Sequence, residues 1–69
     1  MDKINPMHYR VGGIETIDYI QSKMPPEAFE GYLQGNIIKY ISRYKNKNGI
    51  EDLQKAEWYL TRLIKEVQK

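Results

Sequence analysis

The chain contains no cysteine and a single histidine, His8. Without cysteine there is no disulfide framework and no cysteine-rich zinc site, and with one histidine a metal site would depend almost wholly on carboxylates. We therefore expect neither a bound metal nor a cofactor. No run of residues is apolar enough to cross a membrane, and the N-terminal "MDKINP" lacks the apolar core of a signal peptide. The sequence thus predicts a cytoplasmic protein without membrane contact.

The chain is also short and nearly balanced in charge. Its 69 residues allow one domain with a small core, and burial in so short a chain barely offsets conformational entropy unless a ligand or a partner subunit adds contacts. Size alone therefore predicts a homo-oligomer. The formal net charge of +2 is too small to indicate a nucleic-acid-binding protein. The charges are nevertheless unevenly placed, because the stretch between Glu30 and Glu51 contains basic residues and no acidic one.

Apolar periodicity and turn residues divide the chain into a loop and three helices. Residues 1–13 have the turn chemistry of Asn5-Pro6 and Gly12-Gly13. Helices are predicted over residues 14–24, 27–44 and 50–69. Two prolines at 25–26 separate the first two helices, and the sequence NKNG at 46–49 separates the last two. The predicted fold class is all-α: a single domain (1–69) with an N-terminal loop (1–13) and a three-helix or four-helix bundle (14–69), completed by oligomerisation.

The two longer predicted helices each carry an apolar stripe. In the second helix it comprises Phe29, Leu33, Ile37, Tyr40, Ile41 and Tyr44, and in the third Leu53, Ala56, Leu60, Leu63, Ile64 and Val67. Gly31 and Gly35 interrupt the second helix, each at a cost of about 1 kcal/mol relative to alanine. Either the helix breaks near Gly31 or the glycines let something approach the backbone, and we predict one continuous helix.

A candidate anion site lies on the second helix. Asn36, Lys39 and Arg43 are spaced by three and four residues and so share a face, which Tyr40 and Tyr44 border. Two cations beside amide and phenol groups can hold a phosphate, because arginine offers a forked donor and lysine a mobile charge. On the third helix a separate polar face is formed by Asp52, Lys55, Tyr59 and Arg62.

The segment before the first helix offers a second set of ligand-binding groups. His8 and Tyr9 could stack on a base or hydrogen-bond to it. The backbone of Gly12-Gly13 could present N–H groups to an anion at the start of the helix. These glycines match neither a Walker loop nor a dinucleotide fingerprint.

Each of these features also has a purely structural explanation. Gly12-Gly13 is typical of an ordinary turn, and a lone histidine often serves only as a hydrogen-bonding loop residue. Cations near a helix C-terminus are favoured by the helix dipole. Lys55 and Arg62 can pair with neighbouring acids, and the tyrosines and Trp58 can be core or interface residues.

The motifs taken together resemble a known family. They are His8-Tyr9, Gly13-Ile14-Glu15, Gly35-Asn36, Lys39-Tyr40, Arg43-Tyr44, Lys47-Asn48-Gly49, Asp52-Leu53, Lys55-Ala56 and Trp58-Tyr59-Leu60. Over residues 8–63, and in this order, they are similar to small tailed-phage proteins that carry a domain of unknown function and are described as SaV-like or nucleotide-kinase-like.

The resemblance implies nucleotide chemistry in the cytoplasm of an infected bacterium. The expected ligand-binding residues are His8, Tyr9, Gly12, Gly13, Asn36, Lys39, Tyr40, Arg43 and Lys47. A larger relative is a deoxynucleoside monophosphate kinase without a Walker loop. This chain departs from it in being little more than the shared domain, and it shows no obvious general base beside a magnesium-binding carboxylate pair.

Three functions stay open at this stage. The favoured one is a phage anti-defence protein that sequesters a nucleotide, such as a cyclic or ADP-ribose-type immune signal, because binding alone needs no base, nucleophile or metal. The second is a nucleoside monophosphate kinase-like enzyme acting at a subunit interface. The third is a helical adaptor that inhibits a host protein through aromatic anchors. Nucleic-acid binding is disfavoured by the low net charge.

Overall fold

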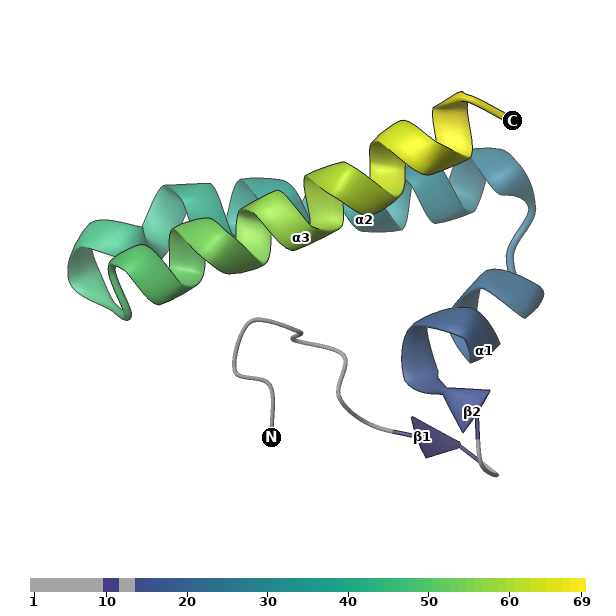
Figure 1. Ribbon diagram of the computed structural model, residues 1–69, viewed down its shortest axis with the longest axis horizontal. Coiled ribbons are helices and arrows are strands. Elements are labelled where there is room, and N and C mark those ends of the chain that lie inside the picture. Colours follow the sequence, from purple (N-terminus) through teal and green to yellow (C-terminus); the bar gives the residue numbers. More distant parts are fainter. Residues whose placement is uncertain (1–9, 12–13) are drawn as a thin grey trace.

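The computed structural model describes residues 10–11 and 14–69, and within them lie three α-helices (Figure 1). The elements are β1 (Arg10–Val11), β2 (Ile14–Glu15), α1 (Thr16–Ser22), α2 (Pro26–Arg43), the 3-10 turn η1 (Tyr44–Asn46) and α3 (Ile50–Val67). The predicted all-α class is confirmed, and no described helix is both long and apolar enough to cross a bilayer.

A small β-ribbon precedes the helices and was not predicted. β1 and β2 pair antiparallel, with Arg10 opposite Glu15 and Val11 opposite Ile14. Strands of two residues are too short to show an alternating pattern, so their apolar spacing could not reveal them. Because Ile14 and Glu15 form β2, the first helix begins at Thr16 and not at Ile14 as predicted. The rest of the expected N-terminal loop, residues 1–9 and 12–13, lies outside the described residues.

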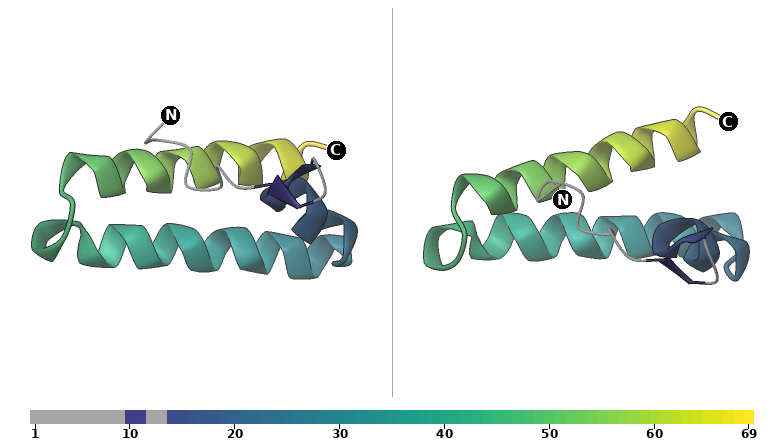
Figure 2. Two further views of the ribbon diagram at one scale, coloured as in Figure 1. Left: turned by 90° about the horizontal axis from the view of Figure 1, so that it is seen from below. Right: turned by 60° about the horizontal axis from the view of Figure 1, so that its bottom comes forward.

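The helices α2 and α3 lie antiparallel and side by side, and α1 lies against the end where α2 begins and α3 ends (Figure 2). As predicted, α2 is one continuous helix through Gly31 and Gly35. A Cβ atom added at either glycine would meet no described atom within 4 Å. Nothing in the described chain therefore approaches the backbone of α2 at these positions.

The turn between α2 and α3 was predicted at residues 46–49 and is confirmed there. Gly49 has a φ of 56°, a left-handed conformation that costs glycine little and other residues much more. Its backbone N–H donates to the carbonyl oxygen of Tyr44 at 2.9 Å. Glu51 and Asp52 then occupy the first turn of α3, where negative charge complements the helix dipole.

Aromatic rings fill the core between α2 and α3. The buried hydrophobic residues of the described chain are Ile17, Phe29, Leu33, Tyr40, Ala56 and Tyr59. The ring of Tyr59 stacks on that of Tyr40, with centroids 6.0 Å apart and planes inclined by 16°. Tyr32 and Trp58 meet Tyr59 edge-on at 6.3 and 5.1 Å. Each such pair adds about 0.5–1.5 kcal/mol beyond area burial, and burial raises the pKa of Tyr59, which keeps its hydroxyl protonated.

The expected apolar stripe of α3 faces the core only in part, through the buried Ala56 and through Leu63, which packs against the core. The residues that α3 buries are Asp52, Ala56 and Tyr59. Leu60, Ile64 and Val67, which were expected in the core, are 46%, 48% and 63% exposed, and Ile41 of α2 is 48% exposed. Stacking of Tyr59 on Tyr40 and pairing of Asp52 with α2 are available only when this side of α3 faces its neighbour. These contacts rotate the aliphatic side of the helix outward.

A buried carboxylate joins the end of α2 to the start of α3. Asp52 is fully buried, and its two oxygens accept hydrogen bonds from Nε and Nη2 of Arg43, both at 3.1 Å. The backbone N–H of Asn48 donates to the same carboxylate at 3.2 Å. The hydrogen bond from Arg43, opposed by burial and aided by Asn48, holds the pKa of Asp52 below its ordinary value of 3.8. We refer to these three residues as the Asp52 clamp.

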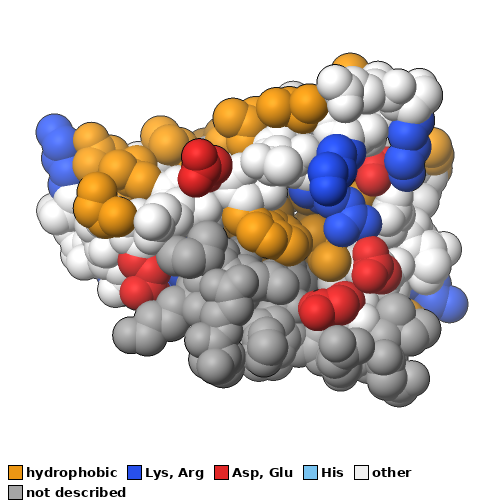
Figure 3. Space-filling view, viewed as in Figure 1, with side chains coloured by type: hydrophobic (Ala, Val, Ile, Leu, Met, Phe, Trp, Pro, Cys, Tyr) orange, Lys and Arg blue, Asp and Glu red, His pale blue; other side chains and the backbone are white. Residues whose placement is uncertain are grey.

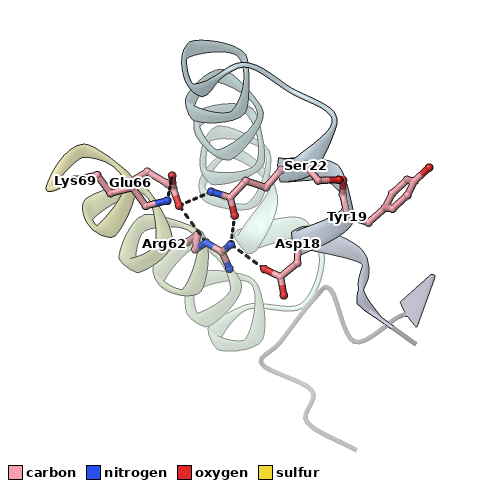
Figure 4. Close-up of polar contacts among 7 residues, drawn as sticks. Asp18, Tyr19, Ser22, Arg62, Glu66 and Lys69 are labelled. Carbon is pink, nitrogen blue, oxygen red and sulfur yellow. Dashed lines mark hydrogen bonds and ion pairs between the residues drawn. The ribbon is translucent and has the colours of Figure 1, made fainter. Parts of the chain in front are cut away.

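A polar network centred on Arg62 attaches α1 to α3 (Figure 4). Arg62 donates to Oδ1 of Asp18 at 3.0 Å and to Oε1 of Gln21 at 2.6 Å. Gln21 donates to Glu66 at 2.9 Å, and Lys69 pairs with Glu66 at 3.0 Å. Partial burial would raise the pKa of Glu66, but Lys69, Gln21 and Arg62 together lower it. The expected pairing of Arg62 with a neighbouring acid is confirmed by the 3.6 Å contact to Glu66.

Replacing Asp52 tests the clamp. Asp52→Asn leaves Arg43 without its counter-charge, so we expect the thermal midpoint to fall by roughly 10 °C. Because the folded pKa of Asp52 lies below 3.8, the wild type keeps this stabilisation above about pH 4 and loses it as pH falls through the lowered pKa. Melts followed by circular dichroism from about pH 7 to about pH 2 should show a shallower acid dependence in the variant.

The matched control for this experiment is Glu51→Gln, one residue earlier in α3. Glu51 makes a solvent-accessible pair with Lys55 at 3.5 Å, and such pairs contribute about 0–1 kcal/mol. If Asp52→Asn melted no lower than Glu51→Gln at neutral pH, the clamp would not be holding the two helices together.

Alanine at Gly35 tests the open side of α2. Since no described atom lies within 4 Å of the added Cβ, we expect Gly35→Ala to raise the free energy of unfolding by about 1 kcal/mol through helix propensity. Gly49→Ala should have the opposite sign because of its φ of 56°. Urea unfolding of both variants measures the effect. A loss of stability in Gly35→Ala would show that something packs against this side of α2.

Candidate functional site

The candidate site is built on the ring of Tyr40, which is only 7% exposed. The stack of Tyr40 on Tyr59 fixes this ring between α2 and α3. Tyr40 lies within α2 and Tyr59 lies within α3, so the helical backbone fixes the position from which each ring projects. The ring of Tyr40 lies near the end of the α2–α3 hairpin where the turn joins the two helices.

Three cationic side chains gather around this ring. Lys39 Nζ lies 4.5 Å from the ring centroid, Arg43 Cζ 4.8 Å and Lys55 Nζ 5.5 Å. Lys39 and Arg43 come from α2, and Lys55 comes from α3. Each contact is a cation–π interaction worth about 0.5–2 kcal/mol. We call Lys39, Arg43 and Lys55 the Tyr40 cation cluster.

The members of the cluster differ in how their charge is balanced. Arg43 is fixed by the Asp52 clamp, and the hydrogen bond from its guanidinium to Asp52 is the main reason that its pKa is raised. Lys55 pairs with Glu51 at 3.5 Å. Within the described part of the chain Lys39 contacts the ring and forms no ion pair. Three cations and two carboxylates leave one positive charge, which is concentrated at Lys39.

This geometry can hold an anion. Lysine side chains are flexible, so the ammonium groups of Lys39 and Lys55 can both turn toward a phosphate. Arg43 already donates to both oxygens of Asp52, so its contribution is chiefly its charge. The two nearby carboxylates are also engaged, because Asp52 accepts from Arg43 and Asn48 and Glu51 pairs with Lys55. Among the described residues no group of three His, Cys, Asp or Glu side chains is placed to hold a metal ion.

The structure brings together only part of the expected site. Lys39, Tyr40 and Arg43 lie together as their spacing indicated. Asn36 lies on the same helix, where its amide donates to the carbonyl oxygen of Tyr32 at 3.0 Å. Lys47 is exposed beyond η1. The expected contributions of four residues lie outside the described chain: His8, Tyr9, Gly12 and Gly13.

One member of the cluster was missed by sequence reasoning. Lys55 was placed on a polar face of the third helix, apart from the phosphate site. The sequence feature that could have revealed Lys55 is its position directly before Ala56, which is buried. Lys39 has the same position relative to the buried Tyr40. In antiparallel helices this offset leads to the same side of the pair, so knowledge of the pairing was needed to join the two lysines.

Comparisons with known proteins point to bacteriophages. A family model described as a protein of unknown function, DUF3310, matches residues 3–61. A gene 1.7 protein of Enterobacteria phage T3 is 40% identical over 63 residues, which cover 84% of this chain and 39% of that protein. A nucleotide kinase gp1.7 of Escherichia phage T7 is 41% identical over 59 residues, which cover 78% of this chain and 30% of that protein.

These matches show which family the chain resembles and how much of each relative it covers. The chain spans well under half the length of either curated relative, and no solved structure matches it. The resemblance to small phage proteins drawn from the motifs is confirmed by the family model, which covers most of the chain. The chain therefore belongs to the DUF3310 family of proteins of unknown function.

Proposed function

We propose that this chain binds a nucleotide, with a phosphate group held by the Tyr40 cation cluster. The observation that carries the proposal is the convergence of three cations from two helices on one buried aromatic ring. An anion between Lys39 and Lys55 would complete the charge balance that Glu51 and Asp52 leave open. The name of the phage T7 relative, a nucleotide kinase, supports a nucleotide as the ligand class.

We further propose that binding takes place without turnover. Phosphoryl transfer needs a positioned base or a water-orienting group in addition to charge stabilisation. The two carboxylates beside the cluster are held by cations, Asp52 by Arg43 and Glu51 by Lys55. Both are therefore placed as counter-charges. This favours sequestration, with a cyclic or ADP-ribose-type signalling nucleotide as the candidate ligand.

Kinase activity is the second candidate, favoured by the identity of 41% to the phage T7 nucleotide kinase. In that case the γ-phosphoryl of ATP passes to a nucleoside monophosphate, leaving ADP and a nucleoside diphosphate. The chain covers 30% of that relative, so the second nucleotide would have to bind elsewhere on the chain or on another subunit.

One incubation series separates these functions. The purified chain is mixed with nucleoside monophosphates plus ATP, and separately with cyclic and ADP-ribose-type nucleotides. Free nucleotide is measured by chromatography before and after heat denaturation. Sequestration predicts a nucleotide that disappears and returns unchanged on denaturation. New nucleoside diphosphate would establish the kinase, and nucleotides that all stay free and unchanged would contradict both.

Substitution of Lys39 tests the site itself. Lys39→Ala should weaken nucleotide binding by about 10- to 100-fold, the range expected for one charge-assisted contact to phosphate, with unchanged helicity because Lys39 is exposed. Lys23→Ala is the matched control, since Lys23 also lies over a tyrosine ring, that of Tyr19, but outside the cluster. Equal affinities of the two variants in calorimetric titration would remove the phosphate assignment.

A further inference from the structure

An aliphatic surface covers one side of the α2–α3 hairpin. Its members, the aliphatic face, are Ile37, Ile41, Leu53, Leu60, Ile64 and Val67. Four of them keep between 46% and 63% of their surface exposed: Ile41, Leu60, Ile64 and Val67. Figure 3 shows hydrophobic side chains gathered along the edge formed by α3. On a monomer this apolar surface would be left in water.

The position of the aliphatic face follows from the buried row, the line of buried residues along which α2 and α3 face each other. Ile41 directly follows the buried Tyr40, and Leu60 directly follows the buried Tyr59. In antiparallel helices an offset toward the C-terminus leads to one side of the pair, and an offset toward the N-terminus leads to the other. Lys39 and Lys55 have the second offset. The aliphatic face and the Tyr40 cation cluster therefore lie on opposite sides of the hairpin.

The helix α1 lies on the side of the cation cluster. Its contacts from Asp18 and Gln21 reach Arg62, which directly precedes Leu63, a residue packed against the core. Arg62 thus shares the offset of Lys39 and Lys55. No described element covers the aliphatic face.

We propose that the aliphatic face binds a second copy of this chain, forming an antiparallel four-helix dimer. The two helices contain 18 residues each, so the face is about 27 Å long and about 20 Å wide. It therefore offers roughly 500 Å² per protomer, or roughly 1,000 Å² in total, which is the lower bound for a biological interface. The dimer also supplies the apolar burial that so short a chain lacks.

The charges along α2 specify an antiparallel partner. Glu27 and Glu30 lie at its start, and Lys45 and Lys47 lie just beyond its end. None of these four forms an ion pair within the described residues. A two-fold axis near the middle of α2 places the acidic start of one copy beside the basic end of the other. Opposite charges at the rim steer association and reject the parallel arrangement.

The arrangement leaves both cation clusters on the outside of the dimer. Each cation cluster then faces away from the two-fold axis, so the two clusters accept ligands independently. The dimer does not depend on the proposed nucleotide function, because it uses the other side of the hairpin.

Sedimentation velocity of the full chain tests the proposal. At roughly 100 µM, above the micromolar constants of ordinary interfaces, the wild type should have twice the protomer mass of 8.2 kDa. Ile64→Glu should raise the dimer dissociation constant at least about 100-fold, because the dimer would bury an unpaired charge. Thr61→Glu, which adds the same charge to an exposed position of α3 outside the face, should remain dimeric. Circular dichroism checks that both variants keep their helices.

A charge exchange provides an independent readout. Glu30→Lys should weaken the dimer, and adding Lys45→Glu should restore it. A monomeric wild type at this concentration would overturn the proposal, as would dimers that persist in both Ile64→Glu and Leu60→Glu. Nucleotide depletion measured with the Ile64→Glu monomer tests the cation cluster separately, so failure of the dimer and failure of the nucleotide site are distinguishable.

Discussion

The rest of the structure depends on one buried ion pair, that between Asp52 and Arg43. A carboxylate without access to water is costly unless its oxygens are fully hydrogen-bonded. Here Arg43 supplies two donors and the backbone of Asn48 a third. These contacts bring together the end of α2, the turn and the first turn of α3. They set which side of α3 faces α2, and the aromatic stack follows from that choice.

The clamp also shapes the candidate site. By holding the guanidinium of Arg43 against the Tyr40 ring at 4.8 Å, it fixes one charge of the cluster. The same rotation of α3 brings Lys55 to the ring and turns Leu60 outward. One buried interaction thus accounts for a cationic side and an aliphatic side on the same helical hairpin.

Much of the fold could be predicted from the sequence because its signals are local. Prolines at 25–26 and Gly49 mark the two helix boundaries, and the continuity of α2 through Gly31 follows from its apolar spacing. The orientation of α3 could not be predicted in this way. A carboxylate counts as polar in a periodicity argument, and Tyr59 falls on the same helical face as Asp52. Both residues were therefore assigned to a polar face of the third helix. Their burial depends on Arg43 and Tyr40, partners on another helix.

The candidate site shows the same limit. Lys39, Tyr40 and Arg43 could be grouped because residues three and four apart on one helix are neighbours. Lys55 could not be added, since its proximity depends on how two helices pair. The division of the hairpin into two sides becomes visible only when the buried row is known, because it rests on offsets of one residue from that row.

The most direct test of the account is a nuclear magnetic resonance titration that observes the rings of the six tyrosines. The chain is labelled at tyrosine and titrated with nucleoside monophosphates and with cyclic and ADP-ribose-type nucleotides. The account predicts that the ligand which binds shifts the ring signals of Tyr40 and leaves those of Tyr19, on α1, unchanged. A nucleotide that binds without moving the signals of Tyr40 would contradict the assignment of the cation cluster as the phosphate site.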